Sequence, residues 1–116
     1  LVRPIVDALR DCGLPAALAE QTRFRNVGER TADCFAFVSD NDVVDNRTGL
    51  KVCGCALRLS ESAVLLQASI PVGTPLVDPR SVIRSARALP AAQDWDSANF
   101  AQAMQNRFAT FTLAIA

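Results

Sequence analysis

The chain has 116 residues, of which 50% are hydrophobic and 21% are charged, as expected for one ordinary folded domain. Twelve Lys and Arg balance twelve Asp and Glu, and the chain contains neither histidine nor tyrosine. This balance argues against an electrostatic nucleic-acid binder and against a polybasic protein of the membrane surface. Without histidine no imidazole can act as a base or a zinc ligand, so Lys, Asp, Glu, Cys or Ser must carry any chemistry.

The first predicted element is a short helix over residues 4–12. A proline suits its first turn, Gly13 suits the left-handed position after its last turn, and three apolar residues recur at i, i+4 and i+7 on one face, namely Ile5, Leu9 and Cys12. Residues 14–21 are ambiguous between a brief helical turn and a covered loop.

Three strands are predicted next, over residues 32–38, 50–59 and 63–70, from their apolar and alternating patterns. A polar connection of hairpin length joins the second to the third. The region 39–49, rich in Asp and Asn, is predicted to be a turn, in which Val43 and Val44 can add a short strand. These runs indicate an antiparallel meander.

The last third of the chain is predicted to be helical. Asp78 is a suitable N-cap for a helix over residues 78–89, and Asp94 or Asp96 caps a final helix. A stripe at helical spacing on the final helix is expected to lie in the core: Phe100, Met104, Phe108 and Phe111. We therefore expect residues 1–116 to form a single α+β unit, an antiparallel β-meander of about three strands flanked by an N-terminal helix and two C-terminal helices.

No stretch of the sequence is apolar for the roughly 20 residues that cross a bilayer, and charges of both signs near the N-terminus do not fit a signal peptide. The four cysteines are expected to be reduced, in a cytoplasmic protein without a membrane partner. Cys53 and Cys55 share a strand face, where neighbours lie about 7 Å apart, too far for an easy disulfide. With no further soft ligands for a metal, the expected role of both thiols is small apolar packing.

The block over residues 34–71 carries a family resemblance. A Cys-Phe pair precedes an Asn-Asp turn, then a Lys-Val-Cys-Gly-Cys-Ala strand, then a strand ending in Leu-Gln-Ala-Ser-Ile; these are residues 34–35, 41–42, 51–56 and 66–70. This order resembles the C-terminal half of the catalytic domain in the biotin/lipoate protein ligase superfamily, in its lipoate–protein ligase and octanoyltransferase branch. The helices expected after the strands occur in the order of that family.

The resemblance implies a ligase that joins lipoate or octanoate to ATP as an acyl-adenylate and transfers the acyl group to a lysine of a lipoyl carrier domain. It implies Lys51 as the catalytic residue, because a fixed ammonium stabilises the charge that develops on the acyl oxygen. It implies that substrate and nucleotide are bound near Asn41, Asp42, Gly54 and Ala56, with Asp42 helping to hold Mg²⁺. Strand alternation places Gly54 on the face opposite Lys51, where a backbone or ligand can approach closely.

The residues by themselves also allow plainer interpretations of the same positions. Lys51 can be an exposed strand lysine, although its face is otherwise apolar, and Asp42 can be an ordinary Asx-turn residue. Arg80, Arg84 and Arg87 form a basic stripe that is either a solvated helix face or a docking surface for an acidic lipoyl domain.

The chain departs from the family pattern in two places. The family's Gln-His-Gly-Ser is Gln67-Ala68-Ser69 here, and nothing in residues 1–30 resembles its Arg-Arg-x-Gly-Gly-Gly phosphate loop. We expect a separate or cleaved N-terminal ligase fragment to supply that loop. No cysteine follows Cys55, which argues against the covalent thioester route of the octanoyltransferases.

Three functional hypotheses follow, and whether the chain by itself is an enzyme stays open. The favoured one is part of a lipoate–protein ligase-like enzyme. The alternatives are a diverged, non-catalytic binding module with the same fold, and a small α+β structural domain whose resemblance is chance. An exposed apolar edge at the first strand would favour the ligase, and a self-contained core would favour the other two.

Overall fold

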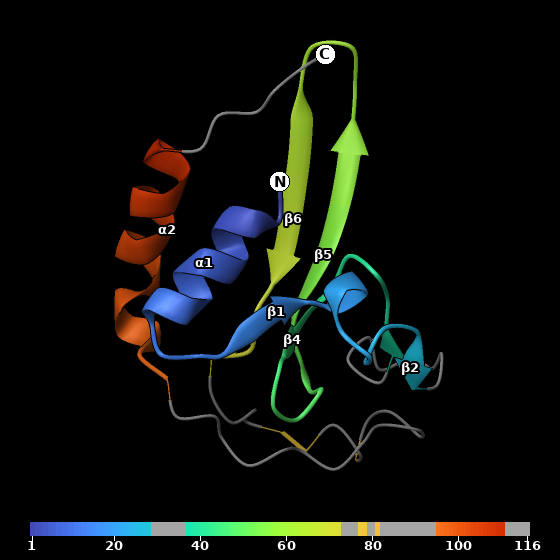
Figure 1. Cartoon of the computed structure of the whole chain (residues 1–116). Helices are drawn as coiled ribbons and strands as arrows, with labels where there is room; N and C mark the ends of the chain where they lie inside the picture. Colours follow the sequence, from blue (N-terminus) through green and yellow to red (C-terminus); the bar gives the residue numbers. More distant parts are fainter. Residues whose placement is uncertain (29–36, 73–76, 79–80, 82–94, 111–116) are drawn as a thin grey trace.

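The computed structural model describes residues 1–28, 37–72, 77–78, 81 and 95–110. Figure 1 shows the elements in chain order, which are helix α1 (Arg3–Asp11), strand β1 (Ala16–Leu18), 3-10 turn η1 (Ala19–Gln21), strands β2 (Val27–Gly28), β3 (Phe37–Val38), β4 (Val43–Asp45), β5 (Lys51–Leu59) and β6 (Val64–Ser69), 3-10 turn η3 (Ser97–Asn99) and helix α2 (Phe100–Ala109).

The main sheet has four antiparallel strands in the order β1-β4-β5-β6, and β2 pairs with β3 in a separate two-stranded ribbon. The chain is therefore an α+β protein with an N-terminal helix, an antiparallel sheet and a C-terminal helix, as predicted. The strand that precedes β5 in the meander is β4, the short strand foreseen at Val43 and Val44, and β1 extends the sheet beyond it. Of the strand predicted over 32–38, only Phe37 and Val38 are described, and they pair with β2.

Helix α1 agrees with the sequence pattern, whereas the predicted cap of the last helix is wrong for Asp96: α2 begins after Asn99, and Asp96 precedes η3 without capping it through its side chain. Helix α1 ends before Gly13, which has a φ of +90°, and the Leu14 N–H donates to the Leu9 carbonyl at 3.1 Å. Ile5 and Leu9 are buried as predicted. Of the helix predicted over residues 78–89, only positions 78 and 81 are described. The basic stripe of Arg80, Arg84 and Arg87 therefore lies outside the described residues.

The stripe predicted on the last helix is buried only in part. Phe100 and Met104 pack against the core, whereas Phe108 is 37% exposed and Phe111 lies outside the described residues. The buried residue of α2 is Ala103, which belongs to the same cluster as Ala8 on α1. Small residues at this crossing let the two helices approach closely, so the larger side chains lie to the side of the contact.

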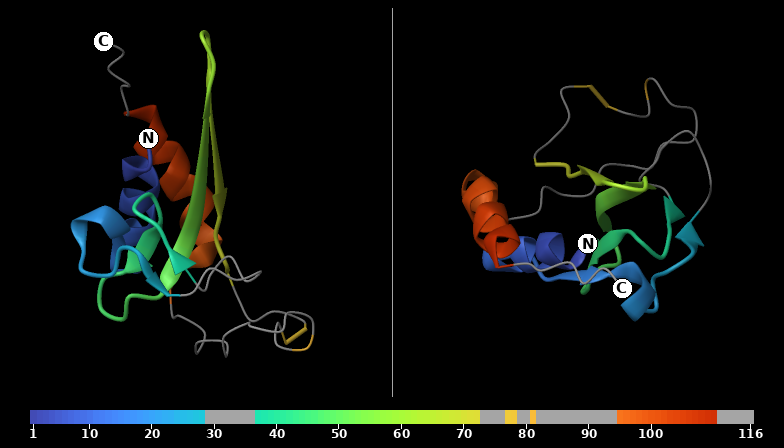
Figure 2. Two further views of the ribbon diagram at one scale, coloured as in Figure 1. Left: turned by 90° about the vertical axis from the view of Figure 1, so that its right-hand side faces the viewer. Right: turned by 90° about the horizontal axis from the view of Figure 1, so that it is seen from above.

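The core lies on both faces of the sheet. Helix α1 covers one face, and α2 packs on α1 away from the strands (Figures 1 and 2). Val43 points to the α1 side with Ile5, Leu9 and Val52, as members of one cluster. Val44 belongs to a second cluster with Ala19 and Val38. Two neighbouring valines on opposite faces therefore anchor β4 in the middle of the molecule.

The outer half of the β5–β6 hairpin projects beyond the rest of the sheet (Figures 1 and 2). Its apolar side chains remain open to solvent, with exposed fractions of 51% at Leu57, 67% at Leu59 and 53% at Leu65. Among the described residues, no helix has the length and apolar character needed to cross a bilayer.

The β4–β5 turn is organised by a buried carboxylate. Asp45 is 1% exposed and accepts hydrogen bonds from the Arg47 N–H at 2.8 Å and from Arg47 Nη2 at 3.0 Å. Burial raises the pKa of Asp45, but the hydrogen bonds and charge of Arg47 outweigh it and hold this pKa below its ordinary value of 3.8. Gly49 closes the turn with a φ of +75°, and its Cα lies against the Phe24 ring, so that a Cβ would overlap the ring.

We expect Asp45→Asn to lower the free energy of unfolding at pH 7 by about 1–3 kcal/mol, because it removes a charged acceptor from a buried turn. A depressed folded-state pKa contributes stability that is present above the unfolded-state value of 3.8 and lost as the pH falls through the folded-state value. The deficit of the variant should therefore shrink as the pH falls below 4, in urea unfolding measured from pH 7 to pH 2.

The matched control is Asp7→Asn. Asp7 pairs at 3.4 Å with Arg3, whose side chain is 58% exposed, so this change should alter the free energy by less than about 0.5 kcal/mol. Equal losses in the two variants would contradict a special role for Asp45.

Candidate site at the start of strand β5

Two residues implied by the family resemblance meet at the beginning of β5. Lys51 is the first residue of this strand, and Asp42 is the last residue of the turn before β4. Lys51 Nζ lies 2.9 Å from Asp42 Oδ2, with side-chain exposures of 9% for the lysine and 4% for the aspartate. The structure therefore excludes the interpretation of Lys51 as an exposed strand lysine.

Further donors and acceptors surround the ion pair. Lys51 Nζ donates to the Phe37 carbonyl oxygen at 3.2 Å. Asp42 Oδ2 accepts from the Ser39 N–H at 2.8 Å and the Ser39 hydroxyl at 3.0 Å, and Asp42 Oδ1 accepts from the Cys55 N–H at 3.4 Å. The turn, the ribbon strand β3 and strand β5 are thus joined at one polar centre.

A buried ion pair of this kind is weak evidence of a stabilising role. Taking two charges out of water costs several kcal/mol per ion, and their attraction often does no more than offset that cost. Its effect is rather to hold an ammonium group in a defined place with little water around it. Groups held in this way are what electrostatic stabilisation of a developing negative charge requires.

Gly54 lies beside the end of the lysine side chain. A Cβ at this position would lie 3.3 Å from Lys51 Cε and 3.6 Å from Nζ, which is a crowded contact. The prediction that Gly54 lies on the face opposite Lys51 is therefore wrong. Strict alternation fails because the β4–β5 register shifts, with Val43 paired to Cys53 and Val44 paired to Lys51.

The other two implied residues lie away from the ion pair. Asn41 is exposed on the turn, and Ala56 is exposed on β5, where it pairs with Gln67. Both side chains are open to solvent, so adjacency in the sequence is not sufficient to bury a side chain at the site.

The arrangement does not fit the Mg²⁺ that the resemblance implies. Both oxygens of Asp42 already accept from donors, one of which is an ammonium that occupies the place of a cation. Mg²⁺ requires an octahedral set of oxygen ligands, and the described residues hold no group of three or more His, Cys, Asp or Glu that could bind a metal ion. We derive no step through Mg²⁺.

Three contributors to the site were missed by sequence reasoning. Ser39 caps the Asp42 carboxylate from three residues away, a spacing typical of Asx and Ser/Thr turns that could have revealed it. The Phe37 carbonyl reaches Lys51 from a separate strand, and no sequence signal announces such a contact. Asp40 belongs to the same turn, and its buried Oδ1 finds no hydrogen-bond donor in the part of the chain that the structure describes.

The two cysteines of β5 lie next to the polar centre and close to each other. Their Sγ atoms are 3.5 Å apart, and Cys53 is fully buried. The hydrogen bond to Cys55 and burial both raise the pKa of Cys53. The hydrogen bond from Cys53 lowers the pKa of Cys55 against the opposing effects of burial and of the Asp42 charge, and the Lys51 charge adds a smaller lowering effect. The expectation of plain apolar packing was incomplete, because it considered backbone spacing and not the rotamers that turn the two sulfurs together.

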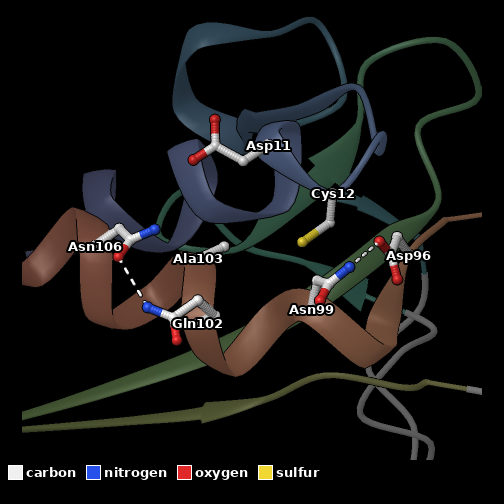
Figure 3. Close-up of a pocket in the computed structure, with 7 residues that line it drawn as sticks. All are labelled: Asp11, Cys12, Asp96, Asn99, Gln102, Ala103 and Asn106. Atoms are coloured by element: carbon white, nitrogen blue, oxygen red, sulfur yellow. Dashed lines mark hydrogen bonds between the residues drawn. The ribbon is translucent and has the colours of Figure 1, made fainter.

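A hollow lies between α1 and α2 (Figure 3). Its lining is polar, and Gln102 donates to Asn106 within it. Cys12 also lines it, but burial and the neighbouring Asp96 and Asp11 raise the pKa of this thiol, which makes it a poor nucleophile. Asp11 is held by two hydrogen bonds from Arg107, so its carboxylate serves to connect the helices.

We expect Lys51→Met to lower the free energy of unfolding by about 3–5 kcal/mol, because it leaves the buried Asp42 carboxylate without its cation. Adding Asp42→Asn to this variant should restore about 1–3 kcal/mol, since partners in contact show coupling of that size. The measurement is urea unfolding of the wild type, both single variants and the double variant.

Arg58→Met is the matched control, since it removes a cation from an exposed position of the same strand. It should change stability by no more than about 0.5 kcal/mol. If the effects of Lys51→Met and Asp42→Asn simply add, the two side chains are not coupled in solution.

Comparisons with known proteins give no indication of what the site does. No family model matches this chain, and no curated protein or solved structure does so either. The buried pair of Lys51 and Asp42, with Gly54 beside it, is accordingly the observation on which a functional conclusion has to rest.

Proposed function

We propose that this chain is part of a lipoate–protein ligase-like enzyme, which attaches a lipoyl or related acyl group to a lysine of a carrier protein through an acyl-adenylate. The observation that carries the proposal is the desolvated ammonium of Lys51, held by Asp42 at 2.9 Å in the position where the family resemblance implies a catalytic lysine.

The environment of Lys51 suits charge stabilisation. The ammonium is 9% exposed, and two acceptors, the Asp42 carboxylate and the Phe37 carbonyl, fix its position. A fixed charge in a site poor in water stabilises a developing oxyanion without being reorganised as the reaction proceeds. In this proposal Lys51 donates a hydrogen bond to the acyl carbonyl oxygen, both when the adenylate forms and when the target amine displaces AMP.

Gly54 leaves room for such a ligand. Because glycine has no Cβ, residue 54 does not crowd Lys51 Cε and Nζ, and in this proposal the acyl carbonyl group approaches the ammonium on that side. Any larger residue at this position would crowd the end of the lysine side chain. In this proposal Lys51 supplies the charge, and Gly54 leaves the side on which the acyl group approaches it uncrowded.

The remaining parts of the proposed enzyme come from elsewhere. ATP supplies the adenylyl group as a substrate, and its phosphates need a cradle of backbone N–H groups that the proposal assigns to a glycine-rich N-terminal ligase fragment. The acceptor is the lipoyl domain of a target protein. A cytoplasmic location belongs to the proposal and is supported by the free thiols of Cys12, Cys53 and Cys55.

A second candidate function is a non-catalytic interaction module. The observation that favours it is the outer half of the β5–β6 hairpin, where Leu57, Leu59 and Leu65 are each more than half exposed. Leu57 and Leu59 share one face of the hairpin with Val64, whereas Leu65 lies on the other face beside Arg58. Exposed apolar side chains on one face of a projecting hairpin are typical of a surface that binds another protein. In this case the ion pair would only hold the base of the hairpin.

The test of the ligase proposal is binding of a hydrolysis-resistant lipoyl-adenylate analogue to the purified chain, together with any polypeptide that co-purifies with it in native mass spectrometry. We expect Lys51→Met to weaken this binding by about 10²-fold, the effect of removing one charged donor to an oxyanion-like group. Gly54→Ala should weaken it through crowding, while leaving the charge in place.

Arg58→Met is again the matched control and should bind the analogue like the wild type. Circular dichroism of each variant separates loss of binding from loss of fold. A monomer that binds neither the lipoyl nor the octanoyl analogue, and releases no pyrophosphate with ATP and either acid, would sink the ligase proposal. Binding of a lipoyl domain by that same monomer would favour the interaction module.

A further inference from the structure

The Cys53-Gly54-Cys55 segment holds two thiols that the proposed ligase chemistry does not use. Their Sγ atoms lie 3.5 Å apart at the start of β5. The two thiols differ in access, because Cys53 is completely buried and Cys55 is partly exposed. Cys55 is therefore the residue of the two that a reagent from solvent would meet first, and the Cys53 sulfur is already in contact with its sulfur.

We propose that Cys53 and Cys55 form a thiol–disulfide exchange site, in which Cys55 reacts with a low-molecular-weight disulfide of the glutathione class and Cys53 resolves the product into an internal disulfide. The attacking and the resolving thiol are assigned by exposure. The inference rests on the geometry of β5 and is independent of the proposed ligase function.

The surroundings of the pair favour this division of roles. The Cys53 thiol can donate its hydrogen to Cys55, which favours the thiolate at the exposed position. The Lys51 ammonium acts in the same direction and the Asp42 carboxylate against it, and the hydrogen bond is the largest effect. The thiolate is the attacking species in disulfide exchange. Cys53, buried among Val43, Val52 and Ile5, keeps its proton until a neighbouring sulfur becomes electrophilic.

The exchange balances in two steps. The Cys55 thiolate attacks one sulfur of the small disulfide, forms a mixed disulfide and releases one small thiolate, which takes a proton from solvent. Cys53 then loses its proton to solvent and attacks Cys55 Sγ, which breaks the mixed bond and releases the second small thiolate. The protein has lost two protons and two electrons, and the small disulfide has been reduced to two thiols.

Strand geometry makes the internal disulfide strained and hence reversible. Residues i and i+2 of a strand have Cα atoms about 6.4–6.8 Å apart, at the upper limit for a disulfide. The Gly54 between the cysteines lets the backbone bend toward the shorter distance. Strained disulfides are more oxidising and more easily reduced than structural ones, so the site is suited to reversible exchange.

Oxidation would be transmitted to the ion pair next to it. The Cys55 N–H donates to Asp42 Oδ1 at 3.4 Å, and Asp42 holds Lys51 at 2.9 Å. Drawing the two cysteines together shifts the backbone that carries this N–H. The oxidation state of the dithiol would therefore change the position of the Asp42 carboxylate.

The test uses mass spectrometry on the full chain. The protein is incubated with oxidised glutathione, its remaining thiols are blocked by alkylation, and it is digested with trypsin. Cleavage after Lys51 and Arg58 releases residues 52–58, which hold Cys53 and Cys55 and no other cysteine. We expect this peptide to lose the mass of two hydrogens and to take no alkyl group, and dithiothreitol to restore it.

Two variants assign the roles, and one cysteine of the same chain is the control. Cys53→Ala should accumulate a stable glutathione adduct on Cys55, because nothing resolves it, whereas Cys55→Ser should leave Cys53 unmodified in the folded protein. Cys12, buried and with a raised pKa, should stay reduced in the same digest.

Three results would overturn the proposal. They are a glutathione adduct that persists on wild-type Cys55, a peptide 52–58 that stays fully alkylated, and oxidation that appears only after the chain has been unfolded. Because the wild-type chain gives the decisive readout, failure of a variant to fold would not affect the conclusion.

Discussion

The contact between the Lys51 ammonium and the Asp42 carboxylate is the constraint on which the centre of this structure depends. It joins the turn before β4 to the first residue of β5, and the Phe37 carbonyl brings the β2–β3 ribbon to the same point. Neither charge can be buried alone, since an unpaired ion in the interior costs several kcal/mol. The turn before β4, the β2–β3 ribbon and strand β5 are therefore expected to become ordered together during folding.

A local irregularity of the sheet gives this centre its shape. The register shift between β4 and β5 puts Val52 and Cys53, which are neighbours in the sequence, into one core cluster, and brings Gly54 beside Lys51. A regular pleat would have placed the glycine on the other face, away from the charge. The shift thus brings both the glycine and the two β5 thiols close to the ion pair.

The two ends of the β5–β6 hairpin serve different purposes. Its base lies under α1, where the core clusters hold it rigid, and its outer half leaves Leu57, Leu59 and Leu65 largely exposed. A rigid base is what a positioned charge and a positioned thiol pair require. The exposed outer half is open to another polypeptide, which is compatible with a ligase completed by a second fragment and with an interaction module.

The sequence by itself determined the α+β class, helix α1 with its glycine end, the hairpin, and Lys51 and Asp42 as residues of interest, because periodicity, capping and short motifs are local properties. Tertiary structure decided that β4 pairs with β5 while Phe37 and Val38 pair with β2, and that Asn41 and Ala56 stay exposed. It also decided that Gly54 faces Lys51 and that the Cys53 and Cys55 sulfurs meet. These features depend on a register shift and on side-chain rotamers, which packing between distant segments selects and no local pattern encodes.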